Sequence, residues 1–115
     1  MVETLGIVAD DLTGAIDTAG VFASAGMATY VSLSTSAPPP GLAPEILCVN
    51  TGTRYRAAAD VAGRVREATR ALLSSGYPQL YKKIDSTLRG HVAAEIAAML
   101  DATDAPFAFV APAFP

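Results

Sequence analysis

The sequence predicts an α/β fold, a mostly parallel five-stranded sheet with helices on both faces, of the Rossmann-like open-sheet type. Three observations predict it. Short apolar or β-branched runs alternate with longer segments in which apolar residues recur at helical spacing. Glycine and proline separate these segments, and small polar clusters follow three of the apolar runs. With 115 residues, the chain is expected to form one domain.

The first half of the chain predicts two strands around one helix. Leu5–Ala9 is a continuous apolar run, which is typical of a parallel strand covered on both faces. Thr13 is predicted to cap the next helix, whose apolar residues keep helical spacing until Gly26. Thr29–Leu33 alternates and is rich in β-formers, so it is predicted as the second strand. Residues 34–44 are rich in proline and are expected to form a loop.

The second half repeats the alternation of strand and helix. Ile46–Val49 is predicted as the third strand, and a long amphipathic helix is predicted from about Ala57 to Ser75. The remaining predicted elements are a strand at Leu80–Ile84, a helix from about Leu88 to Leu100, and a fifth strand at Phe107–Ala111.

Composition excludes several classes of protein. A formal net charge of -3 argues against a general nucleic-acid or membrane-surface binder, because such proteins present a basic face. The single cysteine, Cys48, excludes an intramolecular disulfide and is expected to be a small buried apolar residue. No positively charged region precedes an extended apolar segment, and no apolar run approaches the ~18 residues of a membrane helix. A cytoplasmic location is therefore expected.

A ten-residue string, Tyr81–Gly90, carries the strongest indication of a site. It contains both lysines of the chain, Lys82 and Lys83, together with Asp85, Ser86, Thr87 and Arg89. It runs from a predicted strand into the start of a predicted helix, where free N–H groups bind carboxylate or phosphate. The string predicts an anion-binding site. The alternative is a surface ion pair between Lys83 and Asp85.

Three polar clusters are expected to meet at one edge of the sheet. Asp10–Gly14, Asn50–Arg54 and Asp85–Gly90 each follow a predicted strand. In open parallel sheets, ligands bind outside the carboxyl ends of the strands. The sequence contains neither a Walker nor a Rossmann glycine motif, so a nucleotide site is not supported.

Two of these clusters offer alternatives at single residues. Asp10 and Asp11 could supply a general base or oxygen ligands for Mg²⁺, and helix capping is the alternative. Neighbouring residues of a strand point to opposite faces, so the two are not expected to face one ligand without a turn between them; Asp11, nearer the helix, is favoured. Arg54 is predicted to clamp an anionic group, the alternative being an ordinary surface arginine.

These motifs resemble those of the four-carbon acid sugar kinases, which phosphorylate threonate, erythronate or 3-oxo-tetronate with ATP. Three strings carry the resemblance: Ile7–Ala15, Tyr81–Gly90 and Val110–Pro115. Their order and spacing agree with the family along essentially the whole chain. One departure is at Asn50 and Thr53, where the family commonly has Asp and Ser, and it bears on substrate preference.

The resemblance implies a division of labour between domains. Members of the family have an N-terminal sugar-acid-binding domain and a C-terminal nucleotide-binding domain. Residues 1–115 are expected to be the N-terminal part of the first, truncated, with the sheet incomplete at its C-terminus and the nucleotide-binding domain absent. ATP and Mg²⁺ are implied for the complete enzyme and are expected not to bind this chain, which should be inactive alone. An uncovered strand edge is expected to make it a homo-oligomer.

The resemblance also implies roles for the site residues. Arg54, Lys83 and Arg89 would hold the substrate carboxylate together with the N–H groups near Ser86 and Thr87. Asp11 or Asp85 would orient or deprotonate the accepting hydroxyl, and Asp10 and Lys82 complete the predicted substrate-binding set. The alternative functions are a non-catalytic sugar-acid-binding or regulatory module, and a folded scaffold without activity.

Overall fold

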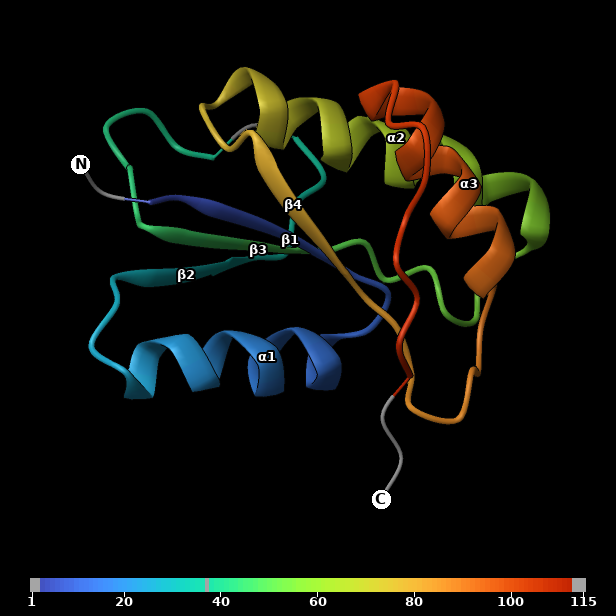
Figure 1. Cartoon of the computed structure of the whole chain (residues 1–115), viewed down its shortest axis with the longest axis horizontal. Coiled ribbons are helices and arrows are strands. Elements are labelled where there is room, and N and C mark those ends of the chain that lie inside the picture. The colour runs from blue at the N-terminus through green and yellow to red at the C-terminus, as the bar shows by residue number, and fades with distance from the viewer. Residues whose placement is uncertain (1–2, 37, 113–115) are drawn as a thin grey trace.

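The computed structural model describes residues 3–36 and 38–112, so Ala113, Phe114 and Pro115 of the third resemblance string lie outside the described residues. Helices and strands alternate, which confirms the α/β fold (Figure 1). The elements are β1 (Leu5–Ala9), α1 (Leu12–Ser24), β2 (Thr29–Ser32), β3 (Ile46–Asn50), α2 (Ala58–Ser74), β4 (Gln79–Lys83) and α3 (Val92–Thr103).

The strands form one parallel sheet in the order β2-β3-β1-β4. Helix α1 covers one face of this sheet, and α2 and α3 cover the other, as the sequence predicted (Figure 1). β1 lies between β3 and β4 and pairs with both, with Ala9 opposite Asn50 on one side and Lys83 on the other. The carboxyl ends of these three strands therefore lie side by side.

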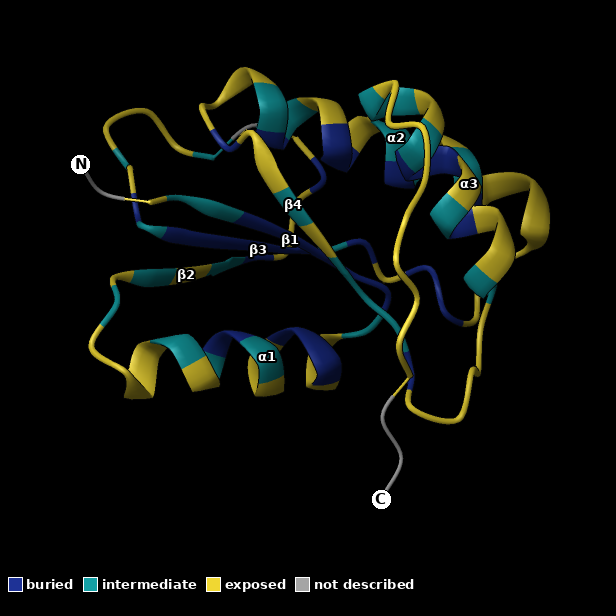
Figure 2. Cartoon of the chain, viewed as in Figure 1, coloured by how far each residue is buried: buried dark blue, intermediate teal, exposed yellow. Residues whose placement is uncertain are grey.

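Each central strand contributes side chains to two cores. Val8, Leu47 and Val49 pack beneath α2 and α3, whereas Ile7 and Cys48 pack against α1. Both faces are covered, so β1 and β3 are almost entirely buried, and their sequences are apolar runs without alternation (Figure 2). Burial raises the pKa of the Cys48 thiol to about 12, so it stays protonated and packs as an apolar group.

The predicted fifth strand is wrong for the described residues. The sheet has four strands, and residues 105–112 belong to none of them. Helix α3 ends at Asp104, whose left-handed backbone turns the chain. The following segment then runs along a cavity of about 530 Å³ whose walls include Leu80 of β4 and Phe107. A ladder needs backbones ~4.8 Å apart, so a segment held off by side chains cannot pair.

Two helix starts also differ from the prediction. Asp11 caps α1 in place of Thr13, with its carboxylate accepting the Gly14 N–H at 3.0 Å. Helix α3 begins at Val92 instead of Leu88, because Leu88 has a φ of 63°, which a right-handed helix cannot accommodate. The described residues of the proline-rich segment form the predicted loop between β2 and β3. Among the helices of the described part, none is long and apolar enough to cross a membrane.

Leu47 tests the core beneath α2 and α3. Its side chain is 1% exposed, so Leu47→Ala should lower the free energy of unfolding by about 2–5 kcal/mol through lost burial and the cavity left behind. Leu33→Ala is the matched control, because Leu33 is 68% exposed and should change stability by no more than about 0.5 kcal/mol. Urea unfolding followed by circular dichroism measures both, and equal effects would contradict the assigned core.

Candidate functional site

Arg54 lies at the centre of the carboxyl edge of the sheet and binds two aspartates. Its Nε and Nη2 donate to the two oxygens of Asp10 at 3.0 and 3.1 Å, a bidentate pair. Its Nη1 donates to Oδ2 of Asp11 at 3.0 Å, and Oδ1 of Asp85 is 3.7 Å from Nη2. Arg54 and Asp10 are both buried. The hydrogen bonds to Asp10 are the main cause that raises the pKa of the Arg54 guanidinium above its ordinary value.

Asp10 and Asp11 both face this one guanidinium, because the chain bends directly after β1. Asp10 and Asp11 were expected to point to opposite faces only if the strand continued through both residues. Asp11 divides its two oxygens, since Oδ1 accepts the Gly14 N–H and Oδ2 accepts from Arg54. Asp11 therefore combines helix capping, one of the alternatives that the sequence left open, with an ion pair to Arg54 that the sequence did not predict.

Asp85 organises the loop between β4 and α3. Its carboxylate accepts from Nε and Nη2 of Arg89 at 3.0 and 2.8 Å, and from the backbone N–H and hydroxyl of Thr87. The hydrogen bonds from Arg89, followed by those from Thr87, hold the pKa of Asp85 well below its usual range. The same contact raises the pKa of Arg89. The N–H groups of Thr87 and Arg89 point to Asp85, and α3 begins only at Val92, so the helix N-terminus lies further along the chain than the sequence predicted.

Gly90 allows this loop to pack against the Arg54 centre. Its φ is 90°, and a Cβ added there would lie 2.9 Å from Oδ2 of Asp10 and 3.3 Å from Cγ of Arg54. Any larger residue would thus meet both a left-handed backbone and a filled space. The glycine lets the loops after β1, β3 and β4 come into contact.

The two lysines of β4 point to opposite faces, as successive residues of a strand must. Lys82 faces α3, where its Nζ lies 3.1 Å from Oε1 of Glu95. Lys83 lies on the α1 side: a Cβ at Gly14 would be 3.5 Å from its Cγ, and its Nζ donates to the Ile84 carbonyl. Of the two predicted anion-binding ammonium groups, only that of Lys83 lies on the side of Asp11.

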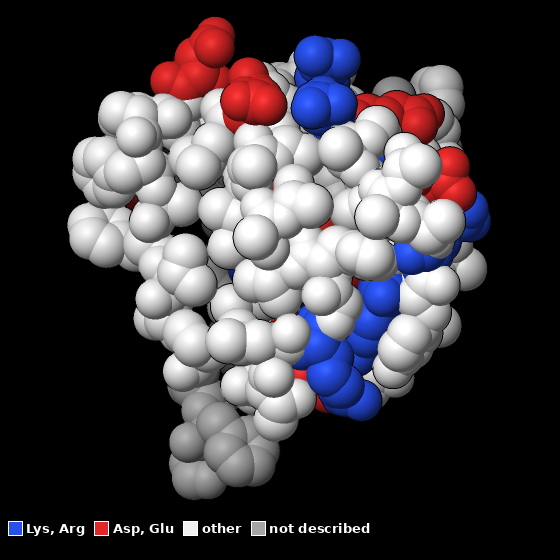
Figure 3. Space-filling model, turned by 90° about the vertical axis from the view of Figure 1, so that its right-hand side faces the viewer, with Lys and Arg blue, Asp and Glu red and all other residues white. Residues whose placement is uncertain are grey.

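At the surface of the site the arginine side chain is more exposed than the carboxylate. The side chains of Arg89 and Asp11 are 60% and 24% exposed, and Ser86 and Thr87 are exposed as well. Figure 3 looks onto the face at which the strands end; lysines and arginines form a band in its lower right part, and another basic group and most of the acidic groups lie near its upper edge. Arg54, Lys83 and Arg89 balance the three aspartates in formal charge, and Arg89 is the exposed cation among them.

The described residues hold no group of three or more His, Cys, Asp or Glu side chains that could bind a metal ion. The oxygens of Asp10, Asp11 and Asp85 already accept hydrogen bonds from Arg54, Arg89, Thr87 and the Gly14 N–H. These carboxylates therefore do not fit the role of Mg²⁺ ligands, which the sequence left open for Asp10 and Asp11.

Sequence reasoning missed three buried polar residues that support the site. Glu95 lies on α3, and Thr51 and Thr53 lie in the loop after β3; all three are at most 1% exposed. The signal was present in the sequence, because Glu95 is the single charged residue in the otherwise apolar run Val92–Leu100.

Comparison with known proteins places the chain in a family. A family model described as a sugar-binding N-terminal domain matches residues 5–115, and the chain belongs to this family. It is 48% identical over 116 residues to a D-threonate kinase of Bordetella bronchiseptica, covering 96% of this chain and 29% of that protein. A D-erythronate kinase of Heliobacterium modesticaldum is 40% identical, covering 83% of this chain and 22% of that protein. A 3-oxo-tetronate kinase of Burkholderia multivorans is 32% identical, covering 96% and 27%.

The solved structures agree with this assignment. A domain of unknown function from Bordetella bronchiseptica, a domain-swapped dimer with bound citrate, is 46% identical with a TM-score of 0.74 and covers 85% of this chain and 25% of that one. The chain thus spans less than a third of the length of the relatives it matches.

Asp85 should control part of the acid stability. A carboxyl group whose pKa is lower in the folded protein stabilises the fold above its unfolded pKa, near 3.8, and this stabilisation is lost as the pH falls through the folded pKa. Asp85→Asn should therefore be less stable than the wild type near neutral pH, and the difference should shrink as the pH falls below about 4.

Thermal unfolding at a series of pH values measures this effect. Asp17→Asn, at an exposed position of α1, is the control and should follow the wild type throughout. A difference between Asp85→Asn and wild type that stays constant down to the acid range would contradict the assigned hydrogen bonds of Asp85.

Proposed function

We propose that the chain is the substrate-binding part of an ATP-dependent kinase that phosphorylates a four-carbon sugar acid, such as threonate, erythronate or 3-oxo-tetronate. The observation that carries the proposal is the juxtaposition of exposed Arg89 and half-buried Lys83 with Asp11 at the carboxyl edge of the sheet. The cations suit a substrate carboxylate, and Asp11 suits a substrate hydroxyl. The relatives, named as kinases of three such acids, support this class of substrate.

Arg89 and Lys83 are the proposed carboxylate-binding groups. Arg89 uses Nε and Nη2 for Asp85, which leaves Nη1 for a ligand. Lys83 uses one of its three donors for the Ile84 carbonyl. Ser86 and Thr87 would add hydroxyl contacts, while Asp10 and Arg54 hold the loops in place. The citrate in the Bordetella bronchiseptica structure supports recognition of carboxylates.

Asp11 fits the proposed proton acceptor better than Asp85. The low pKa of Asp85, caused by its hydrogen bonds from Arg89 and Thr87, makes this carboxylate a weak base. Asp11 is more exposed than Asp85 and accepts two hydrogen bonds, one from the Gly14 N–H and one from Nη1 of Arg54. In phosphoryl transfer, a carboxylate in this position orients the accepting hydroxyl and takes its proton.

The nucleotide is proposed to come from outside this chain. No loop here has the glycine pattern that cradles a triphosphate, and the carboxylates do not fit a metal site. The greater length of the relatives supports a separate nucleotide-binding domain, with residues 1–115 as part of the sugar-acid-binding domain. The cytoplasmic location and the absence of nucleic-acid and membrane partners stay predictions from composition.

Titration of the 115-residue chain tests the proposed substrate site. Calorimetry should show binding of D-threonate and no binding of ATP. Arg89→Ala should weaken D-threonate binding by about 10- to 100-fold, because a charge-assisted contact contributes about 1.5–3 kcal/mol. Arg70→Ala, at an exposed position of α2, is the matched control and should bind like the wild type.

Two results would contradict the proposal. D-threonate affinity that is equal in Arg89→Ala and in the wild type would exclude Arg89 from the site. Turnover of ATP by this chain alone would contradict the separation of substrate and nucleotide domains.

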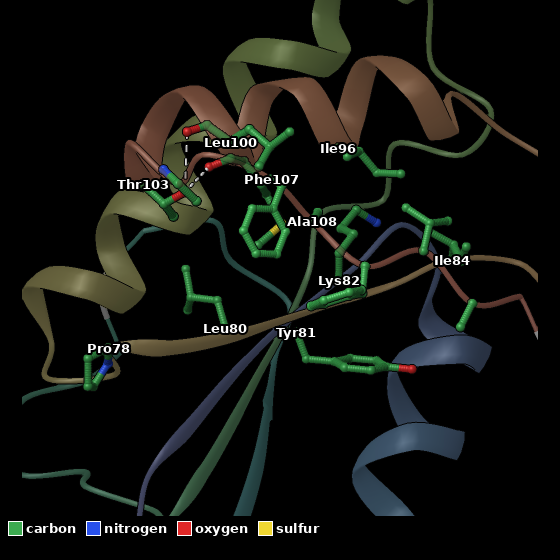
Figure 4. Close-up of a pocket in the computed structure, with 15 residues that line it drawn as sticks. Pro78, Leu80, Tyr81, Lys82, Ile84, Ile96, Leu100, Thr103, Phe107 and Ala108 are labelled. Carbon is green, nitrogen blue, oxygen red and sulfur yellow. Dashed lines mark hydrogen bonds between the residues drawn. The ribbon is translucent and has the colours of Figure 1, made fainter.

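Homo-oligomerisation is proposed to occur through the free edge of β4. Within residues 3–36 and 38–112, β4 pairs with β1 alone, and it borders an apolar cavity shared with α3 and residues 105–111. In Figure 4, Leu80 and Phe107 lie at this cavity, and Tyr81 borders it and also borders α1. Phe107 and Phe109 stack edge to face and are 63% and 91% exposed. We propose that residues 107–111 of a second copy add a strand to this edge, which the swapped dimer of the relative supports.

Light scattering with size exclusion measures the association. The wild type should form a dimer, and Phe109→Asp should shift it toward monomer, because a charge at this position opposes burial at an interface. Val21→Asp is the control, since Val21 is also exposed, at 70%, but lies on α1. A strictly monomeric wild type would overturn the proposed pairing.

A further inference from the structure

Glu95 is a buried carboxylate that touches two other elements. It is 1% exposed on α3, and its Oε2 accepts from the Thr53 hydroxyl at 3.0 Å. Its Oε1 is 3.1 Å from Nζ of Lys82 on β4, close enough for an ion pair, although the angles do not make this contact a hydrogen bond. Glu95 therefore joins α3 both to β4 and to the loop after β3.

The contacts continue from Glu95 to the end of β1. The Thr53 hydroxyl lies 2.7 Å from that of Thr51, which in turn donates to the Ala9 carbonyl at 3.0 Å. Thr53 gives its single proton to Glu95, and the single proton of Thr51 can go either to the Ala9 carbonyl or to the Thr53 oxygen. Both threonines are fully buried. This network, Lys82–Glu95–Thr53–Thr51, reaches the carbonyl of Ala9, the residue before Asp10. It also includes Thr53, the residue before Arg54.

The energetics of such a pair favour a role in positioning. Removing two charges from water costs several kcal/mol per ion, so apolar residues of similar size often stabilise a core equally well. Yet the ion pair lies where the loop of Arg54 meets α3. The backbone N–H of Arg54 donates to the Asp10 carbonyl at 3.2 Å, so a displacement of Thr53 moves the loop that delivers the guanidinium to Asp10 and Asp11.

We infer that Glu95 and Lys82 are positioning residues, which act through Thr53 to hold Arg54 against Asp10 and Asp11. Lys82 was predicted to bind substrate directly; in this assignment its ammonium group neutralises Glu95 inside the fold. Glu95, Thr53 and Thr51 are buried behind Arg54, so in this assignment they act without contact to the ligand. The position of Arg54 can be measured without a ligand, and only the measurement of D-threonate affinity rests on the proposed function.

The first experiment compares Glu95→Gln with Glu67→Gln, the same change at an exposed position of α2. The NMR signal of the Arg54 Nε–H reports its hydrogen bond to Asp10, without any ligand. Glu95→Gln should shift and broaden this signal and weaken D-threonate binding by about tenfold, an effect typical of a residue that orients a binding group. Glu67→Gln should leave both unchanged.

A second pair of variants keeps the ion pair intact. Thr53→Val removes the hydroxyl at nearly constant volume and should have the same effects as Glu95→Gln. Thr53→Ser keeps the hydroxyl and should restore both the Arg54 signal and the affinity. This pair decides the question if Glu95→Gln does not fold.

The outcomes separate positioning from stabilisation. Variants of Glu95 and Thr53 that melt at lower temperature but keep the wild-type Arg54 signal and D-threonate affinity would overturn the inference. Failure of the wild type to bind D-threonate would instead contradict the proposed function, and the Arg54 signal would still test the positioning role.

Discussion

The bidentate pair between Arg54 and Asp10 is the interaction on which this edge of the protein depends. A guanidinium with 7% of its side-chain surface exposed has lost most of its water, and only well-placed carboxylates compensate for that loss. The pair therefore fixes the distance between the loops after β1 and β3. Because Gly90 packs directly on both partners, the loop after β4 is held by the same contact. A buried charge pair, instead of an apolar core, joins the three loops.

Asp11 links this centre to the secondary structure. It begins α1 through the Gly14 N–H and completes the shell of Arg54 through its other oxygen. Helix α1 is thus oriented by the same side chain that faces the exposed cations. Asp11 therefore serves both the fold and the proposed chemistry. Asn at this position would still cap the helix but would carry no charge for Arg54.

Much of the fold was predictable because its signals are local. The apolar runs of β1 and β3 and the stripe of α2 follow from periodicity, and the rule for open parallel sheets predicted that Asp10, Arg54 and Asp85 would meet. Other features depend on contacts distant in sequence. That Arg54 binds Asp10, that Lys82 turns toward Glu95 and that Phe107–Ala111 fails to pair with β4 cannot be derived from spacing. The late start of α3 depends on the left-handed Leu88, which has no sequence signal comparable to a glycine.

The position of β1 in the sheet also has a consequence for the order of folding. The first strand of the chain pairs with β3 and with β4, with Leu5 opposite Ile46 and Gln79. A growing polypeptide therefore cannot complete the sheet until β4 has left the ribosome, and the Arg54 centre closes only after Gly90 follows. Until β3 is made, both edges of the apolar strand β1 lack their native partners, and contacts so distant in sequence form slowly. Synthesis of this chain thus includes an interval in which β1 is available to chaperones or to other nascent chains.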